Sequence, residues 1–308
     1  VGASASGTNV RAMGTGASAS GLNAFATGVG STASGTNVRA EGTSSLATGE
    51  NTSASGTGSR ASGTNSFAAG VGAMASGTNV RAQGTGAIAS GFNAIATGVG
   101  ATATGTNVRA QGTSASASGV NTSASGSGAQ SSGVNSFAKG VAAVANGTNV
   151  SAVGTSAEAT GTNTQSSGVA AYSSGSNTQA SGTNARAIGF NAVAQGTDAM
   201  AEGRNVIAIG TGAKALGYNT NVVAIGTDAF ANGTSVIALG ERARATTRYS
   251  TAVGFNSRAT APNAISIGSS SKAVGPASTA NGNAAHAGHY AATALGSNAR
   301  TEKDHQVA

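Results

Sequence analysis

Small and variable positions alternate along this chain in a fixed seven-residue pattern. A glycine occupies every seventh position from Gly7 to Gly217. Counted from each glycine, the third and fifth residues are small or short, as in Ala17 and Ala19, whereas the fourth and sixth vary. Alternation with a period of two is typical of β-strands, in which successive side chains point to opposite faces. The pattern therefore predicts short strands with an alanine-rich inner face and variable outer positions.

The turn residues show that the true period is fourteen. Asn stands two residues after every odd glycine, as at Asn9 and Asn23, whereas the position after even glycines usually holds Gly, as at Gly16. Both residue types tolerate a left-handed backbone conformation. A glycine at every seventh position also excludes a long helix, because each costs about 1 kcal/mol relative to Ala. We therefore predict an all-β parallel solenoid, a β-roll with fourteen-residue coils and two short strands per coil.

The composition allows two other interpretations. The chain has 49 Gly, no Cys and only 8% charged residues, and such sequences are often disordered. A flat, silk-like stack of strands is the second alternative. The strict phase of the apolar residues argues against disorder, and the two unlike half-units argue against flat hairpins. Function in a repeat of this kind is expected on its surfaces rather than in one pocket.

The outward positions of the second half of the chain differ between the two sheets. From about residue 190, the odd half-units place apolar residues at both outer positions, whereas the even half-units carry residues such as Lys214 and Arg244. A contiguous apolar stripe on the outside of a solenoid marks a partner surface. We predict self-association through this sheet. The candidate interface residues are Ile207, Ile209, Val223, Ile225, Ile237, Leu239, Ile265 and Ile267.

These apolar segments carry a recurring motif, Asn-small-apolar-Ala-apolar-Gly. It occurs at 205–210 and 221–226, and closely related segments occur at 235–240 and 263–268. In phase with the glycine ladder, the motif resembles the Yersinia-adhesin-type head repeats of trimeric autotransporter adhesins. The resemblance covers essentially the whole chain, although the apolar motif is strong only from about Ala187. It implies a left-handed roll, a homotrimer packed through the inner strands, and display on the outer membrane of a Gram-negative bacterium.

Internal duplication accounts for the first half of the chain. Residues 1–70 and 71–140 match closely as two five-coil blocks, and 141–186 is a decayed third copy. Residues 187–308 form the motif-rich part. We predict one repetitive head domain over the whole chain, 1–308, which continues toward a neck and stalk outside this sequence. A two-residue slip of the ladder at Asn219-Thr220-Asn221 falls in a predicted turn, where insertions are tolerated.

Arginines occupy the interface phase in the N-terminal half. They alternate with apolar residues such as Phe25 and Phe67. Burying a guanidinium group is costly unless acceptors or anions satisfy it. Two alternatives follow: the arginines form axial layers with water, bound anions or acceptors of neighbouring chains, or the protomers splay apart and the arginines are solvated. The residues concerned are Arg11, Arg39, Arg81 and Arg109.

The densest charge cluster lies at 241–248 in a chain of net charge +7. Arg242, Arg244 and Arg248 form a candidate ligand patch that could dock an acidic glycan or an anionic surface. The alternative is a solvated edge without a ligand. Nucleic acid is not an expected partner, because repeated arginines without stacking aromatic residues make a poor binding groove.

Candidate chemistry is sparse. His286 and His289 lack a nearby Cys or carboxylate set, so no metal site is predicted. A Ser-His-acid triad is not expected, because all three His residues follow residue 285. No phosphate-binding loop ends in Gly-Lys-Ser/Thr. We therefore predict a protein that is not an enzyme, with no catalytic residue, metal or cofactor.

Two functions remain. The resemblance implies a surface adhesin head that binds a host extracellular matrix protein, a glycan or a cell surface through many weak contacts. The alternative is a structural spacer that raises another binding domain above the membrane. An ice-binding array is not expected, because the Thr residues at the turns are interrupted, as at Leu22 and Glu50. The lack of Cys suits a chain that crosses the periplasm unfolded. Membrane contact is expected only through a C-terminal anchor outside this sequence.

Overall fold

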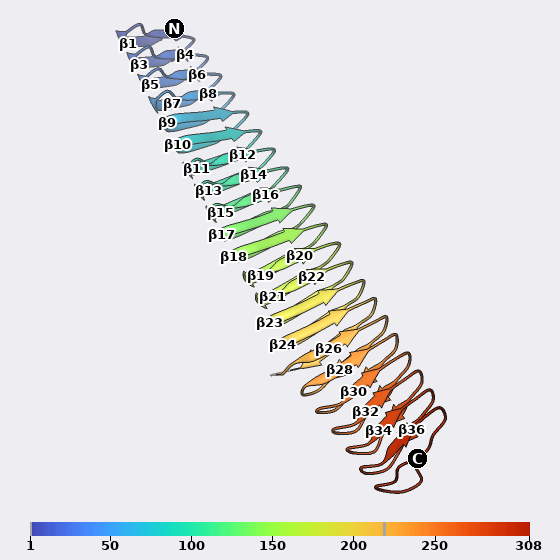
Figure 1. Cartoon of the computed structure of the whole chain (residues 1–308). Helices are drawn as coiled ribbons and strands as arrows, with labels where there is room; N and C mark the ends of the chain where they lie inside the picture. Colours follow the sequence, from blue (N-terminus) through green and yellow to red (C-terminus); the bar gives the residue numbers. More distant parts are fainter. Residues whose placement is uncertain (1, 218–219) are drawn as a thin grey trace. The chain divides into compact units, whose positions relative to one another are not determined.

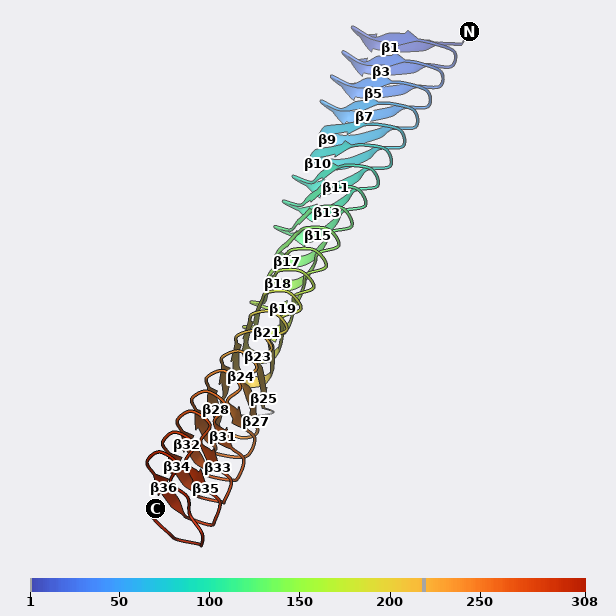
Figure 2. The same cartoon turned by 90° about the vertical axis from the view of Figure 1, so that its right-hand side faces the viewer.

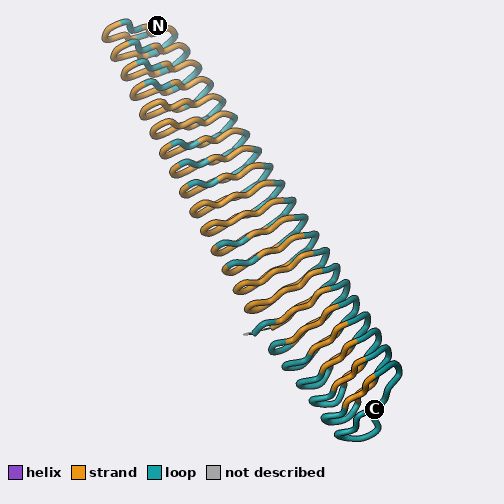
Figure 3. Tube along the Cα trace, in the orientation of Figure 1, coloured by secondary structure: helices purple, strands orange, loops and turns teal. Residues whose placement is uncertain are grey.

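Parallel β-strands make up the protein, with no helix among the described residues (Figures 1 and 3). The computed structural model describes residues 2–217 and 220–308. Most strands pair with the strand one coil further on, as when Ser4 pairs with Ser18, fourteen residues later. This register confirms the predicted all-β parallel solenoid with fourteen-residue coils. The chain divides into two compact units, Val1–Ala152 and Val153–Ala308, which are described in turn.

In the first unit most coils contain a five-residue and a three-residue strand. The prediction of two short strands per coil is confirmed there, but four strands of ten residues run through the Asn corner without a break (Figure 1). The strands are β1 (Ser4–Thr8), β2 (Arg11–Met13), β3 (Ser18–Leu22), β4 (Phe25–Thr27), β5 (Thr32–Thr36), β6 (Arg39–Glu41), β7 (Leu46–Glu50), β8 (Ser53–Ser55), β9 (Arg60–Ala69), β10 (Met74–Gln83), β11 (Ile88–Phe92), β12 (Ile95–Thr97), β13 (Thr102–Thr106), β14 (Arg109–Gln111), β15 (Ser116–Val120), β16 (Ser123–Ser125), β17 (Gln130–Lys139) and β18 (Val144–Val153).

A thin alanine layer fills the interior of the first unit. The third and fifth residues after each glycine are buried, as shown by Ala17 and Ala19 at 0% and 1% exposure. The fourth and sixth residues point outward, as predicted from the alternation. Alanine buries little apolar surface, so the hydrogen bonds between coils contribute strongly to cohesion. One of them joins the amide of Ser18 to the carbonyl of Ser31 at 2.8 Å.

The interior also holds hydroxyl groups. Thr52 and Thr122 occupy a coil position that Val38 and Val80 fill elsewhere, and their hydroxyls have no hydrogen-bond partner among the described residues. The equivalent Ser66 donates to the carbonyls of Ser62 and Gly77, each at 2.9 Å. A buried hydroxyl without a partner lowers stability. Thr52 and Thr122 are therefore expected to lower the stability of the first unit relative to valine at the same positions.

The ladder glycines are needed for close approach as well as for their backbone angle. Gly77 has a φ of 130°, which residues with a side chain rarely adopt. A Cβ on Gly77 would overlap the carbonyl oxygen of Gly91 in the next coil. At the other corner, Gly72 has a φ of 66° and nothing within 4 Å of a Cβ built on it. Strict seven-residue spacing thus follows mainly from the contact between successive coils.

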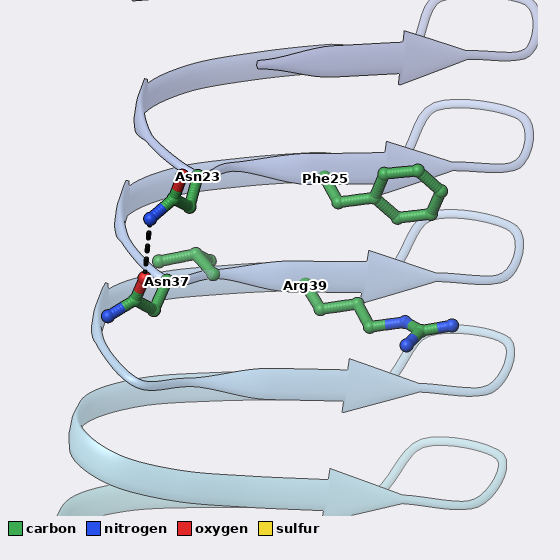
Figure 4. Close-up of a pocket in the computed structure, with 5 residues that line it drawn as sticks. Asn23, Phe25, Asn37 and Arg39 are labelled. Carbon is green, nitrogen blue, oxygen red and sulfur yellow. Dashed lines mark hydrogen bonds between the residues drawn. The ribbon is translucent and has the colours of Figure 1, made fainter. Parts of the chain in front are cut away.

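Asparagines hold the second corner in a left-handed conformation and bond to one another. Asn23 has a φ of 55°, and its side-chain Nδ2 donates to the side-chain Oδ1 of Asn37 at 2.9 Å (Figure 4). In the first unit the chain of amides runs from Asn9 to Asn149 with donor–acceptor distances from 2.9 to 3.2 Å. The corner keeps its backbone bonds too. The predicted left-handed role of Asn is confirmed.

The second unit has the same coil with shorter strands toward its end. Its strands are β19 (Glu158–Thr162), β20 (Gln165–Ser167), β21 (Tyr172–Ser176), β22 (Gln179–Ser181), β23 (Arg186–Gln195), β24 (Met200–Ile209), β25 (Lys214–Gly217), β26 (Val222–Ile225), β27 (Phe230–Asn232), β28 (Val236–Leu239), β29 (Arg244–Ala245), β30 (Thr251–Val253), β31 (Arg258–Ala259), β32 (Ile265–Ile267), β33 (Lys272–Ala273), β34 (Thr279–Asn281), β35 (His286–Ala287) and β36 (Thr293–Leu295). Alanines again fill the interior, joined by Val206, Val222 and Val236.

The predicted slip of the ladder is visible in the register of the second unit. Gly203 pairs with Gly217, fourteen residues on, but Ile207 pairs with Val223, sixteen residues on. The slip was placed at Asn219-Thr220-Asn221, of which Asn219 lies outside the described residues. The pairing brings the side chains after the slip back into the phase of those before it.

The glycine-poor corner of the second unit keeps its turn with other residues. Tyr249, Ala277 and Ala291 have φ values of 56°, 56° and 49°. A left-handed conformation costs roughly 1–2 kcal/mol for a residue with a Cβ. These residues stand at the Asn position of the turn, so the left-handed position is retained without Asn at some cost in local strain, whereas the ladder glycine Gly275 no longer has a positive φ.

Candidate functional site

The second unit carries two adjacent columns of apolar side chains on one outer sheet. Strands β24, β26, β28, β30 and β32 stack in register, so equivalent outward positions line up from coil to coil. All eight predicted interface residues fall in these columns. We call the set the apolar columns: Ile207, Val223, Ile237 and Ile265 in the first, and Ile209, Ile225, Leu239 and Ile267 in the second.

The apolar columns are only partly covered within one chain. Ile225, Ile237, Ile265 and Ile267 are 38 to 39% exposed. Val253, which the sequence reasoning did not select, joins the second column between Leu239 and Ile267. Its fourteen-residue phase was the signal that could have identified it. Thr251 interrupts the first column between Ile237 and Ile265. With that exception, the arrangement leaves an apolar surface of the type that monomeric proteins rarely expose.

The first unit places arginines and aromatic residues in one column at the same coil position. Arg11 pairs with Phe25, which pairs with Arg39. Further along, Phe67 pairs with Arg81, and Arg81 with Ile95. The predicted alternation holds from Arg11 to Arg39 and from Phe67 to Arg109, but Ser53 and Ser123 interrupt it. The guanidinium carbons of Arg11 and Arg39 lie 5.9 and 5.6 Å from the centre of the Phe25 ring, within the range of cation–π attraction.

Each of these arginines also has an acceptor in its own strand, two residues later. The Arg81 guanidinium donates to Oε1 of Gln83 at 3.0 Å, and Arg109 donates to Gln111 at 3.3 Å. Arg39 pairs with Glu41, and Arg11 Nε lies 3.0 Å from Sδ of Met13. The sequence reasoning missed these acceptors, although an acceptor at the second residue after Arg was a readable signal. The position of the arginines relative to an axis stays a prediction, because it depends on assembly.

A shallow depression of about 370 Å³ lies beside one of these layers (Figure 4). Asn23, Phe25, Asn37, Val38 and Arg39 line it. The Asn23–Asn37 hydrogen bond closes its edge, and the Phe25 and Arg39 side chains extend on the same side of the ribbon. It is open on its outer side and combines an aromatic face with a cation.

The predicted ligand patch is spread over one coil. Arg242 lies in the turn before β29, where it pairs with Glu241 at 3.7 Å. Arg244 is the first residue of β29, and its guanidinium carbon stands 5.2 Å from the centre of the Phe230 ring. Arg248 is exposed in the turn after β29. The role of the three as one ligand patch stays a prediction.

Register instead aligns Arg244 with cations of the following coils. Arg244 pairs with Arg258, Arg258 with Lys272, and Lys272 with His286, which bridges to Arg300. The sequence already places Arg244, Arg258 and Lys272 in one phase of the even half-units, whereas the extension of this series to His286 and Arg300 comes from the register. We call the set the basic ladder: Arg244, Arg258, Lys272, His286 and Arg300.

His286 reports the positive field of this ladder. Burial lowers its pKa from the ordinary value of 6.5, and the charges of Lys272, Arg300 and His289 lower it further. The neutral imidazole is therefore favoured. Among the described residues no group of three or more His, Cys, Asp or Glu is placed to hold a metal ion. None of the described segments forms a helix that could span a membrane.

Comparison with known proteins identifies the repeat. A family model described as the YadA head domain repeat matches residues 12–37, 40–59, 61–80, 82–107, 117–140, 131–157, 187–213, 223–243, 231–257 and 245–271, which together make up more than half of the chain. Among solved structures, the collagen-binding domain of the Yersinia adhesin YadA is similar, with 27% identity, a TM-score of 0.31, and coverage of 43% of this chain. The match spans 65% of that solved chain. A search of curated protein sequences gives no match.

The fold and the repeat define a β-solenoid protein of the autotransporter adhesin class. The chain belongs to the YadA head repeat family and forms the head of a trimeric autotransporter adhesin.

Proposed function

We propose that this adhesin head attaches a bacterium to host extracellular matrix or host cells through many weak contacts, without catalysis, from the outer surface of the cell. The observation that carries the proposal is the register of the outer side chains. Because each coil repeats the last, the same kind of contact is presented several times in a row, as with Arg258 and Lys272. Repeated weak contacts gain strength from a high effective concentration.

We also propose that the apolar columns are the contact between the three subunits of a homotrimer. Their apolar, half-exposed surface supports this role. Arg11 and Ile207 share one phase of the fourteen-residue repeat. The strand that carries Arg11 is therefore expected to face the trimer axis, like the strand that carries Ile207. In the layers of Arg11, Arg39, Arg81 and Arg109, acceptors of the same strand together with water or anions then offset the charge near the axis.

Solid-phase binding of the purified chain to collagen, fibronectin, laminin and cultured host cells tests the adhesive function. Saturable binding to at least one of these surfaces is expected. A variant that no longer assembles should bind with an apparent affinity lower by about 10² or more, because the gain from multivalency is lost. Absence of binding to all four surfaces by the assembled protein would remove the proposal.

The duplicated blocks favour a spacer role as the second candidate. The Arg81, Ile95 and Arg109 contacts of the second block repeat the Arg11, Phe25 and Arg39 contacts of the first. Such a duplication adds length with little new surface chemistry. Deleting residues 71–140 removes five whole coils and distinguishes the two roles. If these coils are a spacer, the deletion weakens cell attachment only when the protein is displayed on bacteria. If they carry a binding surface, the deletion also weakens binding of the purified protein.

A further inference from the structure

The basic ladder is a continuous row of cationic positions on the outer sheet of the second unit. Its members lead β29, β31, β33 and β35, with Arg300 in the next coil. Successive parallel strands lie about 4.8 Å apart, so the row places one basic side chain on each of five adjacent coils. All except the partly exposed His286 are exposed. Figure 2 shows β31, β33 and β35 in one row, apart from β34 and β36.

Few acidic side chains stand beside this row: Asp228 lines a depression together with Arg244, and Glu302 follows Arg300 by two residues. Among the described residues, ion pairs join Arg39 to Glu41 and Arg242 to Glu241, and neither pair includes a ladder member. The outward residues beside the row are Asn256, Ser270, Ala284 and Asn298 on the turn side, and Thr246, Thr260, Val274 and Gly288 on the other. Like charges placed directly opposite each other destabilise a sheet.

In the first unit, by contrast, arginines in one column have hydrogen-bond acceptors within their own strands. There Arg81 and Arg109 donate to Gln83 and Gln111 in their own strands. The same offset from Arg258 and Lys272 leads to Thr260 and Val274, and among the described residues neither cation makes a side-chain hydrogen bond or an ion pair. The donors of the basic ladder are thus available to a ligand that brings its own anions.

We propose that the basic ladder binds a linear sulfated polysaccharide of the glycosaminoglycan type, laid along the row so that successive anionic groups meet successive coils. The inference rests on the proposed adhesive function and names the ligand class for it. Sulfate and carboxylate groups form charge-assisted hydrogen bonds with arginine and lysine. The flanking Asn256, Ser270 and Thr260 offer amide and hydroxyl groups to sugar hydroxyls.

Two features favour a polysaccharide over a nucleic acid. Binding of single strands relies on aromatic side chains on which bases stack, and the aromatic residue next to the row, Phe230, already lies under the Arg244 guanidinium at 5.2 Å. The phosphates of a nucleic-acid duplex also follow a helical path, so only a few of them could contact the basic side chains of a straight row. The row lies on different strands from the apolar columns of β26, β28 and β32, so a trimer can present it.

Binding of heparin oligosaccharides to the assembled 308-residue protein tests the proposal. The probe variant combines Arg258→Gln with Lys272→Gln. The matched control combines Arg60→Gln with Arg186→Gln, which lowers the net charge equally from +7 and alters two exposed cations that pair with no other cation. Arg60 is exposed at the same coil position in the first unit but pairs with Leu46 and Met74 rather than with cations.

The ladder variant should weaken heparin binding by about tenfold or more and flatten the dependence of log K on log salt by about two units, one for each contact removed. The control pair should change affinity by less than about twofold. Equal weakening by both pairs would assign the binding to net charge and overturn the proposal. Tighter binding of duplex DNA than of heparin, or equal binding of unsulfated hyaluronan, would also overturn it.

Measuring attachment of the protein to host cells distinguishes the glycosaminoglycan proposal from the adhesive function on which it rests. Host cells treated with glycosaminoglycan lyases should retain fewer protein molecules than untreated cells. If attachment is unchanged and heparin does not bind, the ladder proposal fails while the adhesive function stands. If the protein attaches to neither kind of cell nor to matrix proteins, both fail.

Discussion

Asn79 shows how a single residue serves two purposes at the corner of a coil. Its φ of 58° is left-handed, and its side chain accepts from Asn65 at 3.0 Å and donates to Asn93 at 3.2 Å. The left-handed turn could be predicted from the sequence, because Asn tolerates that conformation. The chain of amides could not, because it depends on rotamers and on the alignment of corners fourteen residues apart.

A ladder glycine such as Gly77 should be far less replaceable than a turn glycine such as Gly72, which stands two residues after a ladder position. Gly77→Ala places a Cβ on the carbonyl oxygen of Gly91, so the coils must separate. Gly72→Ala adds only left-handed strain of about 1–2 kcal/mol. The midpoint of thermal unfolding, followed by circular dichroism, should fall much further for Gly77→Ala. Similar midpoints for the two variants would contradict the close-approach argument.

At the scale of the strand, the inner and outer faces could be assigned from alternation alone. The third and fifth residues after the ladder glycines proved largely buried and the fourth and sixth outward, because a period of two fixes the face of each residue. The continuous strands such as β9 and β10 were not predicted. The left-handed corner keeps its backbone bonds to the next coil, as between the amide of Asn93 and the carbonyl of Thr78 at 3.0 Å, so pairing passes through the bend.

Replacing the unpartnered threonines of the interior should stabilise the fold. Thr52→Val and Thr122→Val each remove a buried hydroxyl without a partner, and Val38 shows that the position accepts valine. Each change is expected to raise the free energy of unfolding by about 1–3 kcal/mol. Denaturant unfolding of the two variants measures the effect. The reverse change, Val80→Thr, should lower stability by a similar amount, and no change in either direction would refute the reasoning.

The pH dependence of stability should report His286. Burial, and then Lys272 and Arg300, hold its folded pKa below 6.5. As the pH falls through 6.5, the unfolded chain binds a proton before the folded chain does, so stability is full above that pH and declines below it. The unfolding midpoint measured from pH 7.5 to 5.5 should fall less in His286→Gln than in the natural sequence. An identical decline in both proteins would exclude His286 as its source.

At the scale of the whole chain, the fold and the family could be predicted because one unit repeats many times. Each position is sampled in many coils, so a single exception such as Glu50 does not hide the rule. The candidate surfaces were predicted unequally. The apolar columns were found because they are uniform, whereas the basic series was recognised only from Arg244 to Lys272, because the next residues in register, His286 and Arg300, lie in the irregular end of the repeat.

Assembly should depend on the apolar columns. The double variant Ile237→Asp with Ile265→Asp places charges at two levels of the proposed subunit contact, where a charge without a partner is costly. Sedimentation velocity should show a trimer for the natural sequence and a monomer for this variant. Val169→Asp, which alters an apolar residue that is 52% exposed outside the columns, should remain trimeric. A monomeric natural protein would refute the assembly proposal.

Stacking at a constant fourteen-residue step has a consequence for how such a head changes over generations. Unequal recombination between nearly identical blocks, such as residues 1–70 and 71–140, adds or removes whole coils. Since every coil meets its neighbour through the same backbone contacts, the new junction is already a native one, and each column continues in phase. Reach can therefore vary among descendants in a single genetic event without any compensating substitution.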